Sequence, residues 1–195
     1  MASQNSDHQH WLRDEQTDLA VERILDAAGT VFVQRGIAGT GMADIARAAS
    51  CSRATLYRYF ENRASLRQAY VNREARRVAA AVGRATAAIA DPRERLVEVV
   101  LTSVDLVRST PTLAAWFSSS DMGIASQLST SSEVIAALAN GAPGGVDDRP
   151  AAQWIVRSIV SILTMPGGSA IEERSLVETF MVPPLLAPGR VRPRR

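Results

Sequence analysis

Apolar residues recur at helical spacing along most of the chain, and this periodicity restricts the fold more than any other feature of the sequence. Between residues 17 and 35 they lie three, four or seven positions apart, so they share one face of a helix that Gly36 ends. Strand-like alternation of apolar and polar residues is missing, and no Asn-Gly or Asp-Gly pair joins two alternating runs. The pattern predicts an all-α protein.

Start signals divide the chain into successive helices. The strongest is "DPRE" at 91–94, with an N-cap aspartate, a proline at the first helical position and a capping-box glutamate. Helices are expected to open at Thr40–Gly41, Ser52, Asn62, Asp91, Pro111, Ser131, Asp147–Pro150 and Ser169. The helix that opens at Asn62 should continue to about Ala90, the one at Ser131 to Asn140, and the last one to about Met181.

These helices form two domains with a tail at each end. We expect a disordered tail over residues 1–16, a domain of three short helices over 17–62, and a larger helical domain over 63–182. A loosely attached Pro/Arg-rich tail should follow over 183–195, because prolines there disfavour a continued helix.

Positive charge is concentrated in one part of the chain. Residues 35–84 contain ten arginines against Asp44, Glu61 and Glu74, a net charge of +7, whereas the whole chain has a net charge of +2. Such a block attracts a polyanion, although an arginine-rich solvated helix surface has the same composition. Charge alone leaves both interpretations open.

Other features limit the class of protein. The chain has no apolar run of roughly 18 residues or more, and its polar start lacks a signal-peptide core, so we expect a cytoplasmic protein without a membrane span. The single cysteine, Cys51, excludes an internal disulfide. His8 and His10 have no further metal ligands nearby, and no glycine-rich phosphate loop is present, so we expect no metal, cofactor or enzyme activity.

The segment "DIARAASCSRATLYRYF" combines two short helices with a tight "SCS" turn, which is typical of a helix-turn-helix unit. In such units the N-terminal residues of the second helix enter the major groove of DNA. Arg53, Ala54 and Thr55 occupy those positions, with Ser52 as the N-cap. Arginine can bond guanine, and the threonine methyl group can contact thymine.

Spacing assigns the remaining side chains of this short helix. Leu56 and Phe60 are four positions apart, so they should share the face that packs inward. That leaves Tyr57, Arg58 and Tyr59 facing outward, where hydroxyl and guanidinium groups suit phosphate oxygens. A core tyrosine at 57 and a merely solvated arginine at 58 are the competing interpretations.

Two helix starts offer further phosphate contacts. Arg63 lies beside free backbone N–H groups at the start of the long helix, an arrangement that favours an anion. Thr40, Gly41 and Met42 lie at the amino end of the second helix, where N–H groups are available in the same way.

The helix over 149–165 is apolar on most of its circumference, so it needs cover on more than one side. Its own domain can cover one side, and a second copy of the chain can cover the other together with the last helix. The predicted dimer interface consists of Ile155, Ile159, Ile162, Leu163, Leu176, Val177 and Phe180. A fully buried central helix in a monomer is the competing interpretation.

Residues 22–70 resemble the TetR family of bacterial transcriptional regulators. The segments "ERILDAAGTVFVQRG" and "GTGMADIARAASCSRATLYRYFENRASL" match the family pattern, whereas the rest of the chain matches only in length and helical character. The resemblance implies a three-helix DNA-binding domain, a long connecting helix and a homodimer formed by the last two helices. It also implies that DNA is contacted by Arg53, Ala54, Thr55, Tyr57, Tyr59 and Arg63.

Two positions depart from the family pattern. Ser50 replaces the usual turn glycine, and if this position has a positive φ the serine costs roughly 1 kcal/mol relative to glycine. Glu61 replaces the usual proline and places a negative charge near the phosphates. Neither change removes a predicted DNA contact.

The larger domain of this family binds a small-molecule effector, and we expect the same of this chain. A largely apolar pocket is predicted from Leu101, Val104, Trp116, Phe117, Met122 and Trp154, with Asp105 or Arg108 as a polar anchor. Plain core packing is the competing interpretation for each of them. The sequence thus predicts a homodimeric repressor that an effector releases from double-stranded DNA. A transcriptional activator of the same fold and a helical protein-binding scaffold are the alternatives.

Overall fold

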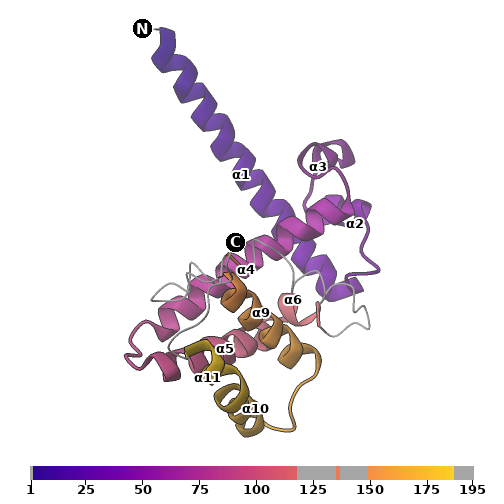
Figure 1. The fold of residues 1–195 in the computed structure, drawn as a ribbon. Coiled ribbons are helices and arrows are strands. Elements are labelled where there is room, and N and C mark those ends of the chain that lie inside the picture. Colours follow the sequence, from indigo (N-terminus) through magenta and orange to yellow (C-terminus); the bar gives the residue numbers. More distant parts are fainter. Residues whose placement is uncertain (1, 118–134, 137–148, 187–195) are drawn as a thin grey trace. The chain divides into compact units, whose positions relative to one another are not determined.

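The computed structural model describes residues 2–117, 135–136 and 149–186, and for residues 2–16 it describes the backbone alone. Every regular element of the described residues is helical (Figure 1), which confirms the predicted all-α class. These elements include α1 (Ala2–Arg35), α2 (Met42–Ala48), α3 (Arg53–Tyr59), α4 (Arg63–Thr86), α5 (Pro92–Ser109) and α9 (Arg149–Thr164). The remaining elements are α6 (Pro111–Ala114), α10 (Ala170–Leu176), the π-helical segment η1 (Val177–Met181) and α11 (Val182–Leu186). Within these residues no helix combines the length and apolar character needed to cross a bilayer.

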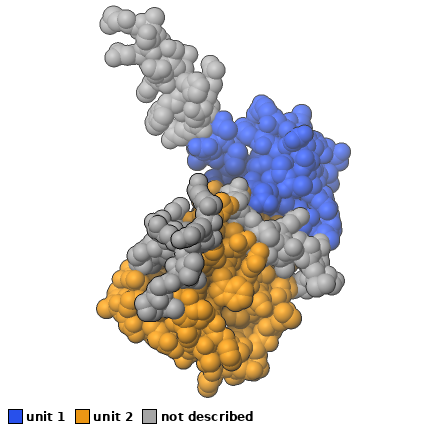
Figure 2. Space-filling model, in the orientation of Figure 1, with its two compact units in different colours: residues 1–70 blue, residues 71–195 orange. Residues whose placement is uncertain are grey.

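The chain divides into two compact units, residues 1–70 and residues 71–195 (Figure 2). The division falls inside α4, eight residues beyond the boundary between residues 62 and 63 that we expected from the sequence. The difference arises because the first turns of α4 contribute buried side chains, Leu66 and Tyr70, to the core of the first unit. That unit therefore needs the start of the connecting helix to complete its core.

The first unit packs α1 and α4 closely. Phe32 of α1 is fully buried and meets the edge of the Tyr70 ring of α4, with ring centroids 5.3 Å apart and planes at 82°. Gly29 lies one turn before Phe32, and a Cβ atom at this position would be 2.9 Å from the Tyr70 hydroxyl oxygen. A glycine at residue 29 therefore permits the close approach of Tyr70 to α1.

The core of the second unit is built mainly from valine and isoleucine. Val97 and Val100 of α5, Ile155 of α9 and Val177 of η1 are at most 2% exposed and belong to one cluster. The start of α5 is the one predicted from the sequence, because the Asp91 side chain accepts a hydrogen bond from the backbone N–H of Arg93 at 3.0 Å and Pro92 follows the cap.

The first helix is longer than expected. We predicted a disordered tail over residues 1–16, but α1 begins at Ala2. The first glycine is Gly29 and no proline precedes it, so nothing in the polar segment ends a helix that the buried second half of α1 already stabilises.

The other differences lie toward the C-terminus. Helix α4 ends at Thr86 rather than near Ala90. A turn follows, in which the N–H of Ile89 donates a hydrogen bond to the Thr86 carbonyl at 3.2 Å. The expected tail over 183–195 begins with helix, because α11 continues to Leu186 and Val182 anchors it in the core. Prolines are tolerated in the first turn of such a segment. Of the helix predicted over 131–140, residues 135 and 136 are described and helical, and the rest lies outside the described residues.

Candidate nucleic-acid interface

Helix α3 begins at a side-chain cap. Ser52 has an extended backbone, and its Oγ accepts a hydrogen bond from the N–H of Thr55 at 3.0 Å. The hydroxyl groups of Ser52 and Thr55 also lie 2.8 Å apart, within hydrogen-bond distance. Leu56 is fully buried and Phe60 is 6% exposed, so the inward face is the one predicted from their spacing. The cap and these two anchors fix which side of α3 faces outward.

The outward side of α3 is cationic and aromatic. Arg53 and Ala54 are exposed, and within the described residues no hydrogen bond or ion pair holds the Arg53 guanidinium. Tyr57 is 49% exposed, which contradicts the interpretation of this residue as core. Arg58 lies over the ring of Tyr59, 5.0 Å from its centroid, and donates a hydrogen bond to its hydroxyl at 3.2 Å. The predicted readout residues therefore share one accessible surface.

The turn between α2 and α3 has the strained geometry that the sequence suggested. Ser50 has a φ of 54°, the left-handed region that favours glycine. Its N–H donates to the Arg47 carbonyl at 3.2 Å, and the N–H of Cys51 donates to the Ala46 carbonyl at 3.0 Å. Cys51 itself is half-buried, with a free thiol. These bonds hold the turn in place despite the unfavourable φ.

The start of α2 differs from our expectation. Thr40 is fully buried and Met42 is 9% exposed, so their side chains belong to the core. The N–H of Gly41, which we expected to face a phosphate, donates to the Asp44 carboxylate at 3.2 Å. The same carboxylate accepts from Arg35 at 2.9 Å and from Arg47 at 3.3 Å.

Asp44 thus supplies the negative charge that this helix start attracts. An acidic residue three positions after a helix cap is the capping-box signal that could have revealed this arrangement from the sequence.

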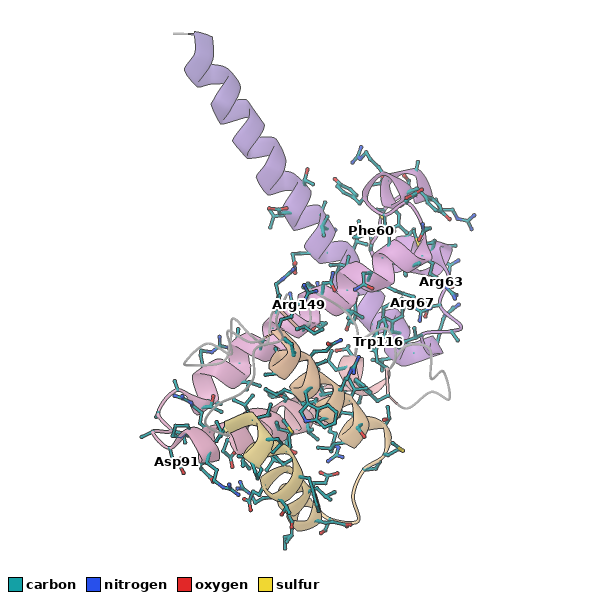
Figure 3. The ribbon with its side chains drawn as sticks, in the orientation of Figure 1. Phe60, Arg63, Arg67, Asp91, Trp116 and Arg149 are labelled. Carbon is teal, nitrogen blue, oxygen red and sulfur yellow. The ribbon has the colours of Figure 1, made fainter. Side chains whose placement is uncertain are left out.

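Arg63, the first residue of α4 (Figure 3), also has partners inside the protein. Its Nη1 donates to the carbonyl oxygen of Ala38 at 3.1 Å and to that of Thr40 at 3.2 Å. The side chain is exposed, yet one of its nitrogens is committed to the loop that precedes α2. This contact could not be predicted from the sequence, since the partners are backbone atoms 23 and 25 residues away.

The residues predicted for an effector pocket differ in their exposure. Val104 and Trp116 are buried at 1% and 5% exposure, Leu101 and Phe117 are half-buried, and Asp105 and Trp154 are exposed. Met122 lies outside the described residues. The contact of an effector with any of these residues remains a prediction.

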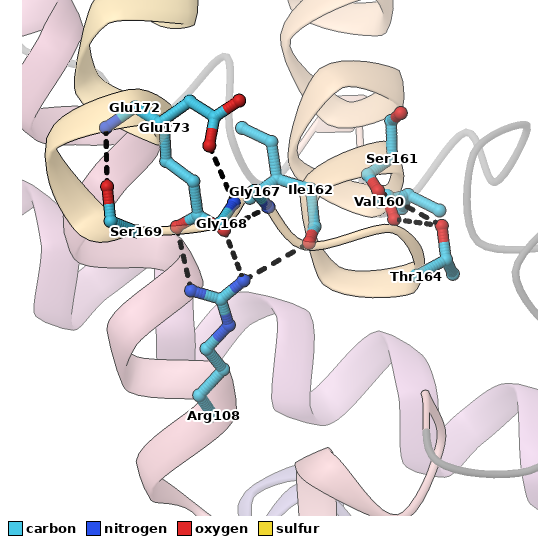
Figure 4. Close-up of polar contacts among 10 residues, drawn as sticks. All are labelled: Arg108, Val160, Ser161, Ile162, Thr164, Gly167, Gly168, Ser169, Glu172 and Glu173. Carbon is cyan, nitrogen blue, oxygen red and sulfur yellow. Dashed lines mark hydrogen bonds and ion pairs between the residues drawn. The ribbon is translucent and has the colours of Figure 1, made fainter.

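Arg108, the second predicted anchor, is engaged in an ion pair (Figure 4). Its Nη1 and Nη2 donate to the two carboxylate oxygens of Glu173 at 2.8 and 2.7 Å, and Nη2 also reaches the Ile162 carbonyl at 3.2 Å. The hydrogen bond to Arg108 lowers the pKa of Glu173, and the same bond raises the pKa of Arg108. In the described arrangement this guanidinium joins α5 to α10 and is not a free anchor.

The predicted dimer residues separate by exposure. Ile155 and Val177 are 2% exposed and belong to the core of their own unit, so we correct their assignment to an interface. Ile159, Ile162 and Leu163 are half-buried, whereas Leu176 and Phe180 are 43% and 71% exposed.

Two further apolar side chains are exposed and were not among the predicted interface residues, Met165 at 73% and Ile171 at 83%. Ile171 lies in the first turn of α10. We call Met165, Ile171, Leu176 and Phe180 the exposed apolar residues of the C-terminal segment.

Comparisons with known proteins place these features in context. A family model described as bacterial regulatory proteins, tetR family, matches residues 24–70, the segment that contains α2, α3 and the start of α4. Two HTH-type transcriptional regulators of Mycobacterium tuberculosis, from strains H37Rv and CDC 1551 and named as uncharacterized, are each 45% identical to this chain over 179 residues. The match covers 89% of this chain and 89% of each relative.

Solved structures with a similar fold include the TetR family repressor AlkX from Dietzia sp., implicated in biodegradation of n-alkanes. Its TM-score is 0.65 at 21% identity, over 84% of this chain and 93% of that chain. The fatty acid degradation regulator FadR from Bacillus halodurans has a TM-score of 0.58 at 20% identity, over 88% and 97% of the two chains. FadR from Bacillus subtilis in complex with stearoyl-CoA has a TM-score of 0.55 at 18% identity, over 85% and 97%. At these identities the likeness is one of fold.

Proposed function

This chain belongs to the tetR family of bacterial regulatory proteins and is a helix-turn-helix transcriptional regulator, and on that premise we propose that it acts as a homodimeric repressor. In this proposal the two α3 helices of the dimer enter successive major grooves of a pseudo-palindromic operator, about one helical turn or somewhat more apart. A small, largely apolar effector bound in the larger unit releases the DNA. Because its target is DNA, the protein works in the bacterial cytoplasm.

The observation that carries the DNA contact is the accessible outward side of α3. Leu56 and Phe60 hold the opposite side in the core, so Arg53 at the start of the helix can enter a groove. Tyr57 and Arg58 flank it at positions suited to phosphates, and small Ala54 allows close approach of the helix backbone.

The proposal of a dimer is supported by the exposed apolar residues of the C-terminal segment. Four large apolar side chains on one short stretch of a monomer are unfavourable in water, and a second copy related by a two-fold axis would cover them. Phe180→Glu should convert the dimer to a monomer in size-exclusion chromatography with light scattering. Arg84→Glu, an exposed change on α4, is the control and should leave the mass unchanged. A monomeric wild-type protein at micromolar concentration contradicts this part of the proposal.

The effector class is proposed as apolar because the larger unit offers a valine- and isoleucine-rich interior. Regulators of similar fold are named for n-alkane and fatty acid degradation, and one of them was solved with stearoyl-CoA, which is consistent with a ligand that carries an alkyl chain. An effector can release DNA only if it binds the DNA-free conformation more tightly than the DNA-bound one.

The test begins with duplexes that the protein selects from a random-sequence pool. A gel shift should retard a selected duplex, retard a shuffled duplex much less, and weaken steeply as salt rises, because counterions are released from the phosphates. Equal retardation of both duplexes, or none, contradicts the assignment. A reporter gene under the selected sequence separates a repressor from an activator, since loss of the regulator should raise transcription. Palmitic acid and palmitoyl-CoA are the first probes for release of the duplex.

A further inference from the structure

We propose that Arg63 is a positioning residue for DNA recognition, which holds the helix-turn-helix pair by joining the start of α4 to the loop before α2. This inference rests on the proposed function and deepens it. Its Nη1 carries two hydrogens, and the two carbonyl acceptors, on Ala38 and Thr40, lie 3.1 and 3.2 Å away. One nitrogen therefore fixes two points of the same loop.

The loop that Arg63 holds has little freedom of its own. Gly36 starts it with a φ of 73°, and the hydroxyl of buried Thr40 donates to the Gly36 carbonyl at 2.7 Å. A Cβ atom on Gly39 would lie 2.6 Å from the Arg35 carbonyl oxygen, too close for any side chain. A loop shaped this tightly transmits a constraint at Ala38 and Thr40 directly to residue 41, the N-cap of α2.

The location of Arg63 connects both ends of the DNA-binding helix pair. It follows α3 by four residues, since α3 ends at Tyr59, and its bonds reach back to the residues just before α2. Helices α2 and α3 pack against each other, and each contributes a fully buried side chain, Ile45 and Leu56. The hydrogen bonds of Arg63 therefore join the two ends of the segment that contains α2 and α3. The orientation of α3 depends on these bonds.

The charge of Arg63 gives a physical reason for its bonds to the two carbonyl groups. A cation at the N-terminus of a helix faces the positive end of the helix dipole, which is unfavourable. The two carbonyl oxygens give Arg63 a compensating partner inside the protein. A residue that served DNA phosphates alone would lack this compensation in the free protein.

The test replaces Arg63 with methionine, which keeps much of the stem and removes the donors. Amide hydrogen exchange, measured without DNA, should become at least tenfold faster at residues 38–41 and remain unchanged in the second unit. Affinity for a selected duplex should fall at least tenfold, with the slope of log affinity against log salt unchanged. The matched control is Arg58→Met, whose side chain contacts Tyr59 and not the loop. It should reduce the magnitude of the slope of log affinity against log salt by about 0.9, the value of one phosphate contact. Hydrogen exchange at residues 38–41 should stay unchanged.

Two results would overturn the inference. If Arg63→Met lowers the salt slope by about 0.9 and loop exchange stays unchanged, Arg63 is a phosphate contact as the sequence first suggested. If exchange becomes faster throughout the protein, the role is one of general stability. A wild-type protein that selects no duplex contradicts the proposed function instead, and the exchange experiment still reports on the loop.

A double-mutant cycle sharpens the result. Gly39→Ala forces the same loop to move without touching Arg63, so it should weaken DNA binding by the same route. If Arg63 acts through the loop, the variant that carries both Arg63→Met and Gly39→Ala should lose little further affinity for DNA. Its affinity should be within about twofold of the single variant that binds DNA less tightly, because coupled sites are not additive. Losses that multiply would show that the two residues act independently and would contradict the inference.

Discussion

Arg53 of α3 and Arg108 of α5 are both accessible to solvent, but their surroundings differ. No group of the described residues holds the Arg53 guanidinium, whereas Arg108 donates to both carboxylate oxygens of Glu173 and to the Ile162 carbonyl. Arg174 in the second unit resembles Arg108, because it contacts Glu94, Glu98 and Glu178. These bonds raise the pKa of Arg174, with the bond to Glu178 as the largest cause.

The difference shows how one residue type serves two purposes in a chain without lysine. An arginine with a carboxylate partner joins helices and contributes to the free energy of unfolding. An arginine without one leaves a net positive charge for a polyanion. Substitutions in the two groups should therefore affect different measurements.

The largest effect is expected for Arg108→Met. It leaves the carboxylate of Glu173, whose side chain is 6% exposed, without its main partner. We expect the free energy of unfolding to fall by about 2–3 kcal/mol, below the usual loss for a fully buried pair because Arg108 is partly exposed and the N–H of Gly167 still bonds Glu173. Urea unfolding measures this change, and Arg157→Met, an exposed arginine on α9, should shift the value by less than about 0.5 kcal/mol.

Arg53→Met, in contrast to Arg108→Met, should change DNA recognition and leave stability unchanged. Its stability should match that of the wild type, while discrimination between a selected duplex and one with a single changed guanine should fall by about 1–3 kcal/mol. Competition gel shifts at fixed salt measure the discrimination. A clear loss of stability with unchanged base preference would remove the distinction between the two arginine groups.

Ser50→Gly tests whether DNA binding depends on the charges of the first unit or on its stability. The φ of 54° at Ser50 is unfavourable for serine, so glycine should stabilise the protein by about 1 kcal/mol without changing a charge. DNA affinity near neutral pH should stay within twofold of the wild-type value.

The smallest effect is expected in how pH changes the difference in the free energy of unfolding between the wild type and Arg108→Met. The folded-state pKa of Glu173 is lowered by its bond to Arg108, so this stabilisation is complete above the ordinary glutamate pKa and is lost as pH falls through the lowered value. The stability difference should be constant from about pH 5 to 7 and should narrow toward pH 3. A gap that widens in acid would show that the pair does not carry the effect.

Local features of the first unit could be predicted from the sequence because they depend on neighbouring residues. The cap at Ser52, the inward face of Leu56 and Phe60 and the positive φ of Ser50 each follow from spacing or turn chemistry over a few positions. The outward face of Tyr57 follows from the same spacing.

Features that depend on distant residues could not be predicted. The partners of Arg63 and Arg108 lie 23 to 65 residues away, and an arginine in a sequence does not show which oxygen it meets. Apolar periodicity likewise predicted that Ile155 and Val177 would be buried, but it could not show that their own unit buries them. Helix in residues 2–16 was not predicted, because a polar composition is typical of a disordered tail, whereas the absence of glycine and proline only permits a helix.

The turn at Cys51 has a practical consequence. This is the only cysteine of the chain, it is half-buried, and it lies between the two helices of the helix-turn-helix unit. A maleimide dye or a nitroxide spin label added to the wild-type protein can therefore attach at one known position in each subunit. Such a probe reports from the turn itself, and in a dimer the distance between the two labels measures the separation of the two helix-turn-helix units.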